Sequence, residues 1–412
     1  MKVSGAAGTR VGGPKRYLWM LGFVAPACAL LPSQLVYRTG VELFWWIGPI
    51  IVFLVIPVLD RLVGDDSSDL SADEYAAVAE GRFYRWCLYS FLPVQFASLV
   101  VASYLWAGDE LSTMAELGLA VTVGFVSGIG ANVAHELGHR VRRLERVLAM
   151  AALAQSGYGH FPVEHNRGHH VWVATPRDPA SSRLGESLWE FLPRCVFGGF
   201  RSALRLERER LRRKGKSWWC VDNQILSAWA ATAVLFGALM LAFGPGVLPW
   251  LVVQAVVGIV LLEAVNYVEH YGLLREQLPD GRYRRCTPRD SWNSDRILTN
   301  AFLFNLQRHS DHHMYPGRRY HTLRSAAGAP QLPAGYITML MLAAIAPWWR
   351  AVMDKRVLDH YSGDVTLANL HPRKRDSLLA KYGAVHPDDV GREVVRHGPV
   401  VNRPGIARYS ID

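Results

Sequence analysis

Apolar residues along this chain gather into long blocks rather than into short alternating runs. One helical crossing of a bilayer core requires about 20 consecutive apolar residues, and six blocks approach that length. The pattern therefore predicts an all-α integral membrane protein with six transmembrane helices. These helices are expected near residues 17–37, 43–59, 88–107, 117–134, 225–243 and 248–268.

The polar connections between these blocks predict an orientation in the membrane. The links after the first, third and fifth blocks are short and resemble tight turns on one side, at residues 38–40, 108–110 and 244–246. Lys and Arg crowd the opposite side, and the positive-inside rule makes that side cytoplasmic. We therefore expect a multi-pass protein of the cell inner (cytoplasmic) membrane, with both termini and the longest polar segments facing the cytoplasm.

Five segments follow from this pattern. After the sixth block the chain is polar and basic, except for an apolar stretch at 336–353 that Pro347 interrupts. Trp348 and Trp349 within this stretch favour an interfacial helix over a seventh span. The expected segments are 1–139 (four transmembrane helices and a first histidine box), 140–224 (cytoplasmic, second box), 225–270 (two transmembrane helices), 271–364 (cytoplasmic, third box and interfacial helix) and 365–412 (peripheral C-terminal tail).

Charge and cysteine content narrow the class of protein further. The formal net charge is +10, but the basic residues cluster beside the apolar blocks, as in the run 205–216. Attraction to anionic lipid explains this placement better than nucleic-acid binding, for which no motif is present. None of the five cysteines forms a C-x-x-C pair, so the sequence predicts neither a zinc knuckle nor a rubredoxin-type site.

Nine of the fifteen histidines carry the candidate chemistry. They occupy three dense boxes, at 135–139, 164–170 and 309–313, and one isolated position in the segment 266–272. Residues three or four apart share a helix face, so we expect His135 with His139 and His165 with His169, with His170 turned toward a second ion. By the same spacing His309 pairs with His312, and His313 lies beside them. Two such patterns favour a two-metal site over a single ion.

The predicted topology brings all nine histidines to one face of the membrane, although topology and boxes depend on different residues. The other six, His160, His321, His360, His371, His386 and His397, are best explained as caps or interfacial residues. The first box, His135-Glu136-Leu137-Gly138-His139, also matches a zinc protease motif with Glu136 as general base. A hydrolytic zinc site needs about three protein ligands, which leaves most of these histidines unexplained. Imidazole-rich sites suit several transition metals, and the spacing alone does not choose iron over copper.

The boxes HELGHR, EHNRGHH and LQRHSDHH, with NYVEHYGL between the last two, resemble those of the membrane alkane 1-monooxygenases, or alkane omega-hydroxylases. These enzymes belong to the fatty acid desaturase/hydroxylase superfamily, and the resemblance extends from about residue 17 to 324. It implies a cytoplasmic histidine-rich domain that holds two non-haem iron ions. The implied ligands are His135, His139, His165, His169, His170, His270, His309, His312 and His313.

The resemblance also implies a reaction and partners. Such enzymes hydroxylate the terminal methyl of an n-alkane to a 1-alkanol with O₂, and we expect medium-chain substrates. Electrons come from NADH through rubredoxin reductase and rubredoxin, and without paired cysteines here the rubredoxin is expected to be a separate protein. A xylene-type aryl-methyl monooxygenase is the alternative within the oxygenases, and the HExxH membrane zinc metalloprotease is the alternative from another class.

Several further side chains are candidates for supporting roles. Metal-bound imidazoles usually donate their second N–H to a carboxylate or carbonyl, and an ionisable residue inside a span usually faces the bundle interior. These rules select Glu263, Glu269 and Asp311, and less specifically Glu136 and Glu164. The aromatic residues expected to wall an alkane channel are Trp45, Trp46, Phe53 and Trp106. The cations expected to dock an acidic rubredoxin are Arg140, Arg167, Arg308, Arg318 and Arg319. Contact with lipid headgroups is the alternative for these arginines.

Overall fold

The computed structural model describes residues 14–108 and 110–383 of the 412 in the chain. Within these ranges the protein is helical, and its extended pairing is limited to isolated bridges such as Leu184 with Leu370. The prediction of an all-α protein is therefore confirmed.

Five helices are long and apolar enough to cross a membrane, which confirms five of the six expected spans. They are η2-α3-η3-α4 (Glu42–Val63), α6-α7 (Arg82–Ala107, with α6 Arg82–Tyr89 and α7 Phe91–Ala107), α8 (Thr113–Gly138), α13 (Gln224–Phe243) and η5-α14 (Pro245–His270, with α14 Leu248–His270). The first expected span is a bent pair, Arg16–Cys28 and α2 (Pro32–Thr39), which meet at 64°. Pro32 begins α2 at the break, where a residue without an N–H is tolerated.

Helix α8 forms the centre of the bundle. Of its apolar window 83% is buried, compared with 44% or less for the other spans. Glycines allow α14 to pack closely against it: a Cβ added at Gly124 would lie 2.5 Å from the Cβ of Val257, and one at Gly258 would lie 2.8 Å from the Oγ of Ser127. Small residues at such crossings are typical of membrane helices, whose association depends on close packing.

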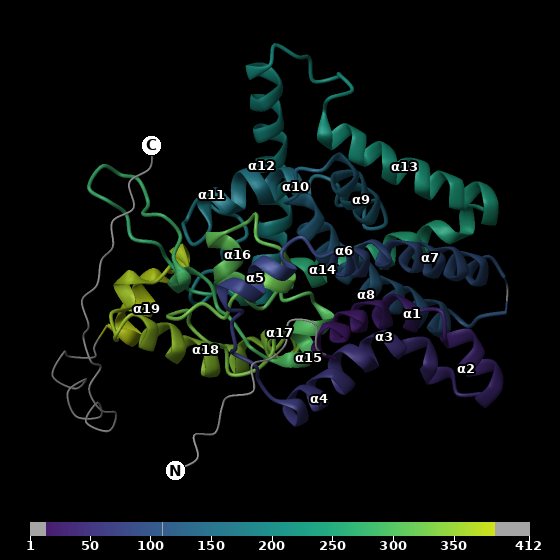
Figure 1. Cartoon of the computed structure of the whole chain (residues 1–412), viewed down its shortest axis with the longest axis horizontal. Coiled ribbons are helices and arrows are strands. Elements are labelled where there is room, and N and C mark those ends of the chain that lie inside the picture. The colour runs from purple at the N-terminus through teal and green to yellow at the C-terminus, as the bar shows by residue number, and fades with distance from the viewer. Residues whose placement is uncertain (1–13, 109, 384–412) are drawn as a thin grey trace.

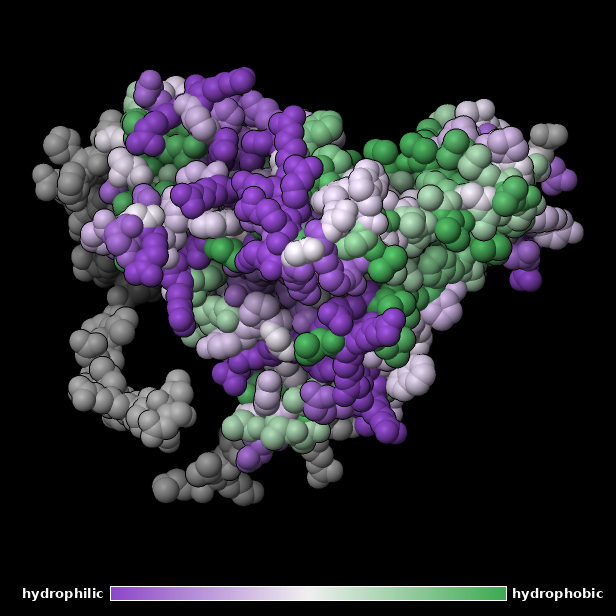
Figure 2. Space-filling view, turned by 90° about the horizontal axis from the view of Figure 1, so that it is seen from above, coloured by the Kyte–Doolittle hydropathy of each residue, from purple (hydrophilic) through white to green (hydrophobic). Residues whose placement is uncertain are grey.

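The polar segments fold together at one end of these helices (Figure 1). The segment after α8 contains α9 (Arg143–Ala154), α10 (Phe161–Glu164), η4 (His165–His169), α11 (His170–Trp172) and α12 (Leu188–Arg213). The segment after α14 contains α15 (Ile297–Phe302), α16 (His309–Met314), α17 (Tyr336–Ala343), α18 (Ala346–His360) and α19 (Arg375–Tyr382). Helix α5 (Ala72–Val78) joins them from the loop before α6. Figure 2 shows apolar surface over the membrane helices and hydrophilic surface over this end.

The apolar stretch at 336–353 forms two short helices, α17 and α18, rather than one span. The prediction of an interfacial anchor through both tryptophans was wrong in one respect. Trp348 is exposed, but Trp349 is fully buried, with its ring 5.1 Å from that of Tyr267. Aromatic packing onto α14 therefore explains this tryptophan. In the C-terminal segment, α19 contacts the folded body through Tyr382, whose hydroxyl donates to Asp354.

Candidate metal centre

Four segments that are distant in the sequence meet at the polar end of the bundle. They are the end of α8, the region of η4 and α11, the end of α14, and α16. Each supplies histidines, so all nine residues of the three boxes and the isolated position converge. Their nitrogens form two groups, and within each group the ligand atoms lie within 4.8 Å of one another. We call these groups the five-histidine cluster (His135, His139, His165, His170 and His312) and the four-histidine cluster (His169, His270, His309 and His313).

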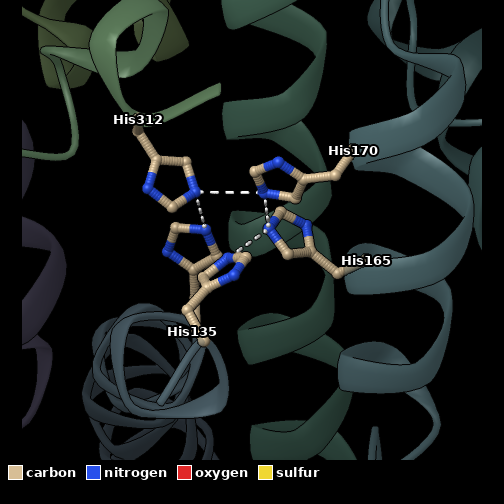
Figure 3. Close-up of side chains that lie close together, drawn as sticks. His135, His165, His170 and His312 are labelled. Atoms are coloured by element: carbon tan, nitrogen blue, oxygen red, sulfur yellow. Dashed lines mark hydrogen bonds between the residues drawn. The ribbon is translucent and has the colours of Figure 1, made fainter. Parts of the chain in front are cut away.

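The rings of the five-histidine cluster turn toward a common point, as Figure 3 shows for four of them. The Nε2 atom of His135 lies 2.9 Å from that of His312, and the Nε2 atom of His139 lies 3.1 Å from that of His165. His170 closes the group, with its Nε2 atom 3.0 Å from His165 and 3.1 Å from His312. Five neutral imidazoles have no mutual attraction that would bring their ring nitrogens this close together. A shared metal ion would supply that attraction.

Box two divides its histidines differently from the sequence-based expectation. His165 joins His170 in one cluster, while His169 belongs to the other, so the predicted pairing of His165 with His169 was wrong. The reason is local: residues 165–169 form a π-helix. In such a turn the backbone hydrogen bonds join residues five apart rather than four, which turns His170 toward the face of His165.

Box three also divides in two. His309 and His313 lie four residues apart on α16, and their Nε2 atoms are 2.8 Å apart in the four-histidine cluster. His312 turns to the five-histidine cluster. The predicted pairing of His309 with His312 was therefore wrong, because α16 presents its i and i+4 positions to one ion and its remaining histidine to the other.

The four-histidine cluster is enclosed by protein and connected to carboxylates. All four of its members are buried. The Nδ1 atom of His169 lies 2.8 Å from Asp178, and that of His309 lies 3.2 Å from Glu269. Asp178 is itself fixed by the Ser181 hydroxyl at 2.6 Å. Such contacts orient an imidazole so that its other nitrogen faces a metal.

Burial keeps most of these imidazoles in the neutral form that binds metal. Burial and the neighbouring rings lower the pKa of His165 and His312 well below the usual value, and the same causes act on His313. His169 is the exception: burial lowers its pKa, but Asp178 outweighs that effect and raises it. Among the rings of both clusters, His169 is therefore the one whose pKa a carboxylate raises above the usual value.

The arrangement fits two transition-metal ions. Two imidazole nitrogens bound at right angles to one ion, each about 2.1 Å away, lie about 3 Å apart, as the Nε2 atoms here do. In the four-histidine cluster the Nε2 atoms of His169 and His270 are buried and have no hydrogen-bond partner. A buried polar atom without a partner is costly, and an ion at this point would remove the cost. Imidazole suits Fe, Cu, Zn and Ni alike.

The site does not resemble that of a zinc protease. Glu136, the general base of that hypothesis, is buried and forms an ion pair with Arg140. The same carboxylate accepts the backbone N–H of Tyr320 at 3.2 Å. A carboxylate held in this way connects α8 to the segment after box three rather than facing an ion, which contradicts the protease alternative.

The other predicted carboxylates have separate environments. Asp311 pairs with Arg318 and accepts the N–H of Arg324, so it contacts no histidine of the clusters. Glu263 accepts hydrogen bonds from Tyr158 at 2.7 Å and Asn266 at 3.0 Å. Among Glu263, Glu269 and Asp311, only Glu269 contacts a histidine of the clusters.

Two further acidic residues, Glu164 and Asp178, lie near box two. The sequence suggested Glu164 as a candidate but not Asp178. Burial, followed by the nearby Asp178, raises the pKa of Glu164 to about 8, so this carboxyl is mostly protonated at neutral pH. Asp178 was not among the sequence-based candidates, because it lies nine residues after its histidine in the Pro-flanked turn Thr175-Pro176-Arg177-Asp178-Pro179. No spacing rule connects such a turn to a metal ligand.

The histidines expected to be incidental lie outside both clusters where the structure describes them. His321 packs its ring flat against Tyr84 at 3.8 Å, and His160 lies against Tyr158 and Phe200. His360 and His371 belong to neither cluster. His386 and His397 lie outside the described residues.

An apolar cavity of 70 Å³ lies within the bundle of membrane helices. Its wall runs along α8 from Thr122 to Asn132, which is three residues before His135. Leu306, three residues before His309, lines the same end. None of the four aromatic residues expected to wall a channel is among its lining residues, although Phe53 packs against the lining residue Phe125 at 5.2 Å.

All five arginines expected to dock a partner contact other groups of the protein. Arg140 is buried beside Glu136, and Arg319 pairs with Glu145 at 3.2 Å. Arg318 pairs with Asp311, as described above, and Arg167 is half-buried against Glu207. Arg308 donates to the carbonyl of Leu323 at 2.8 Å. These guanidinium groups therefore hold the polar segments together, which is a structural role.

Comparison with known proteins agrees with this site. A fatty acid desaturase family model matches residues 112–343, which include every histidine of both clusters. The chain is 44% identical to an alkane 1-monooxygenase of Acinetobacter baylyi over 91% of this chain and 92% of that protein. It is 40% identical to an alkane 1-monooxygenase of Alcanivorax borkumensis, over 90% and 91%. A xylene/toluene monooxygenase hydroxylase component of Pseudomonas putida is 26% identical, over 81% and 86%. The chain therefore belongs to the alkane 1-monooxygenase family, a group of membrane oxidoreductases within the fatty acid desaturase superfamily.

Proposed function

We propose that this protein hydroxylates the terminal methyl group of medium-chain n-alkanes to 1-alkanols, with O₂ and with electrons from rubredoxin. The observation that carries the proposal is the apolar cavity whose lining includes Asn132 and Leu306, three residues before the cluster histidines His135 and His309. An alkane dissolves in the bilayer core, so it enters such a bundle without crossing water. The relatives that share most of this chain are named for alkane oxidation, which agrees with an apolar substrate.

The length of the cavity lining along α8 agrees with a straight chain held by one end. Its wall follows α8 from Thr122 to Asn132, a length of about 15 Å at the helical rise per residue. Asn132 donates its side-chain N–H to the carbonyl of Leu303 at 2.7 Å, which fixes the cavity end against the segment before box three. A methyl group at that end lies within about one helical turn of His135, while apolar walls exclude water.

Two iron ions are the proposed cofactors, one in each cluster. His135, His139, His165, His170 and His312 would hold the first, and His169, His270, His309 and His313 the second. When bound, the iron pair supplies the redox chemistry needed to activate O₂ and cleave a strong C–H bond. The protein supplies orientation: Asp178 and Glu269 align His169 and His309, and the cavity places the terminal carbon.

The proposed setting is the cell inner membrane, with the clusters on the cytoplasmic side. The segments that carry the boxes are rich in Lys and Arg and lie at one end of the bundle, which the positive-inside rule assigns to the cytoplasm. Soluble electron carriers reach that side. We propose that a separate rubredoxin, reduced by an NADH-dependent reductase, delivers electrons to this side.

The test uses the purified full chain with rubredoxin, rubredoxin reductase, NADH and octane. We expect O₂ uptake coupled to 1-octanol formation, and loss of both when a chelator removes the metal. Ferrous iron should restore activity and zinc should not. A zinc-containing protein without O₂ uptake would exclude the oxygenase proposal, 2-octanol as product would exclude terminal attack, and faster turnover of toluene than of octane would support the aryl-methyl alternative.

A further inference from the structure

A second cavity lies outside the bundle core and differs chemically from the apolar cavity that α8 lines. It measures 480 Å³ and is bounded by the end of α8, by α9 and by the beginning of α13. Residues of opposite character line it: the arginines Arg140, Arg143, Arg146 and Arg167, and the apolar Val147 and Met150. A cavity of this size accepts a small organic group.

The cations of this cavity are only partly neutralised. Arg140 and Arg167 are paired with Glu136 and Glu207. Arg143 and Arg146 are exposed, and in the described part of the chain neither side chain forms an ion pair or a hydrogen bond. The single carboxylate in the lining, Asp222, is already paired with Lys216. Two positive charges are therefore free to face an anion here.

The apolar side of the same cavity is open to the surroundings. Val147 on α9 is half exposed, and Val221 in the loop before α13 is 95% exposed. Val141, also in the lining, is 91% exposed, and Leu144 beside it is exposed as well. Residues of this kind are disfavoured in contact with water, but they suit the boundary where the headgroups of a bilayer meet its acyl chains.

The cavity adjoins the ends of two membrane-spanning helices. It opens where the spanning helices α8 and α13 end and begin, at Gly138 and Gln224. Figure 1 shows α9 and α13 as neighbours on this side of the molecule, with α12 rising beside them. Free arginines and exposed valines thus occur together at the rim of the membrane helices.

From these observations we propose that the cavity between α9 and α13 binds the headgroup of an anionic phospholipid. The phosphate lies against Arg143 and Arg146, and the acyl chains descend along Val147 and the outer face of α13. A soluble anion would use the arginines but not the valines. An acidic protein would use the charges at the surface but would not fill a concave space of this volume. Phospholipid matches both sets of residues.

Such a lipid would bind beside the metal centre. His139 contributes to the wall of the cavity, and Arg143 follows it by four residues at the first turn of α9. A bound headgroup therefore links the α8–α9 junction to the start of α13. The site belongs to the membrane setting of the chain and does not depend on which alkane the enzyme oxidises.

The test measures lipid retained by the full-length protein in detergent, by native mass spectrometry, with phosphatidylglycerol or phosphatidylcholine added. Wild-type protein should bind phosphatidylglycerol preferentially. Arg143→Gln with Arg146→Gln should weaken that binding about tenfold or more, since each basic residue contributes to attraction by anionic lipid. The matched control is Arg373→Gln with Arg375→Gln, which removes the same charge from exposed positions at α19 and should leave binding unchanged.

A second pair of variants keeps the proposal testable if the double arginine variant fails to fold. Val221→Glu places a negative charge at the exposed rim and should repel the anionic lipid, while Val221→Gln of the same size should bind it normally. Equal binding of both lipids by wild type, or unchanged binding in both charge variants, overturns the proposal. Displacement by inorganic phosphate would assign the site to a free anion. Unchanged lipid binding with a higher half-saturating rubredoxin concentration would assign the arginines to protein docking, and either result overturns the lipid site.

Discussion

The five-histidine and four-histidine clusters present the same donor atom in different surroundings. In the four-histidine cluster every ring is buried, and Asp178 and Glu269 contact the outer nitrogens of His169 and His309. In the five-histidine cluster His139 and His170 are only partly buried, and no carboxylate contacts any of its rings in the described residues. A negative partner strengthens an imidazole ligand, so the two sites should hold metal with unequal affinity.

The two clusters also differ in how firmly their ligands are held and in what surrounds them. The enclosed cluster resembles a site whose ligands are fixed before metal arrives, because the hydrogen bond between His169 and Asp178 exists without the ion. The more open cluster borders the cavity between α9 and α13 through His139, so its surroundings include water or lipid. If each cluster holds one metal ion, as proposed above, the two ions would have different surroundings, and the following substitutions test that difference.

The largest effect should follow from removing one ligand of each cluster, in His169→Ala and His170→Ala. Each change should lower iron content by roughly half and activity by more than about a hundredfold. Mutation of residues that only support a ligand already lowers metal affinity or activity by about 10- to 100-fold. Mössbauer spectra of the two variants should lack different iron environments. If both variants lost the same environment, the division of these adjacent residues between two ions would be refuted.

Asp178→Asn should come next, with a loss of about 10- to 100-fold in metal affinity at the four-histidine cluster alone. The amide keeps the size of the side chain but removes the charge that His169 contacts at 2.8 Å. Competition with a chelator measures the two affinities separately.

The matched control for this change is Asp311→Asn. Asp311 is equally buried and directly precedes His312, but it pairs with Arg318. That control should lower thermal stability, since it leaves a guanidinium without its partner, and should not weaken one iron selectively. Selective iron loss in Asp311→Asn would contradict the assignment.

Glu269→Gln should have a smaller effect on the same cluster, about tenfold or less in metal affinity. Its contact with His309 is longer, at 3.2 Å, and a glutamine oxygen can still face the ring. Iron titration of the apoprotein measures the change. An effect larger than that of Asp178→Asn would reverse the ranking of the two carboxylates.

The smallest effect on metal content is expected from Phe125→Ala, which changes the lining of the apolar cavity. The change should leave both clusters loaded and shift the product ratio toward longer alkanes by a few fold, because the cavity loses a large side chain. Competition between octane and dodecane measures the ratio. Phe53→Ala is the control, since Phe53 packs behind Phe125 and does not line the cavity.

Much of the fold and all nine clustered histidines could be predicted from the sequence. Span length follows from bilayer thickness, and the boxes have a local spacing that is visible without a structure. The division of the histidines between two sites could not be predicted, because it depends on a π-helical turn at 165–169. Helical spacing rules assume a regular repeat, and they gave the wrong partner for His165.

Residues whose roles depend on tertiary contacts were also missed or misassigned. Asp178 meets His169 only because the chain turns back after α11, and no local pattern marks that return. Arg308, Arg318 and Arg319 were expected on a docking surface, yet each is held by internal partners. A charge count shows how many cations exist, but only the folded chain shows which of them are free.

Neither cluster is contributed by one half of the chain. His312 completes the cluster that begins with His135 on α8, and His169 joins one whose other members lie beyond residue 269. During synthesis, therefore, no fragment that stops before α16 contains a full set of ligands for either ion. Metal loading becomes a late step, available only after the last two spans have inserted, and an incomplete chain in the membrane would lack a finished site for oxygen chemistry.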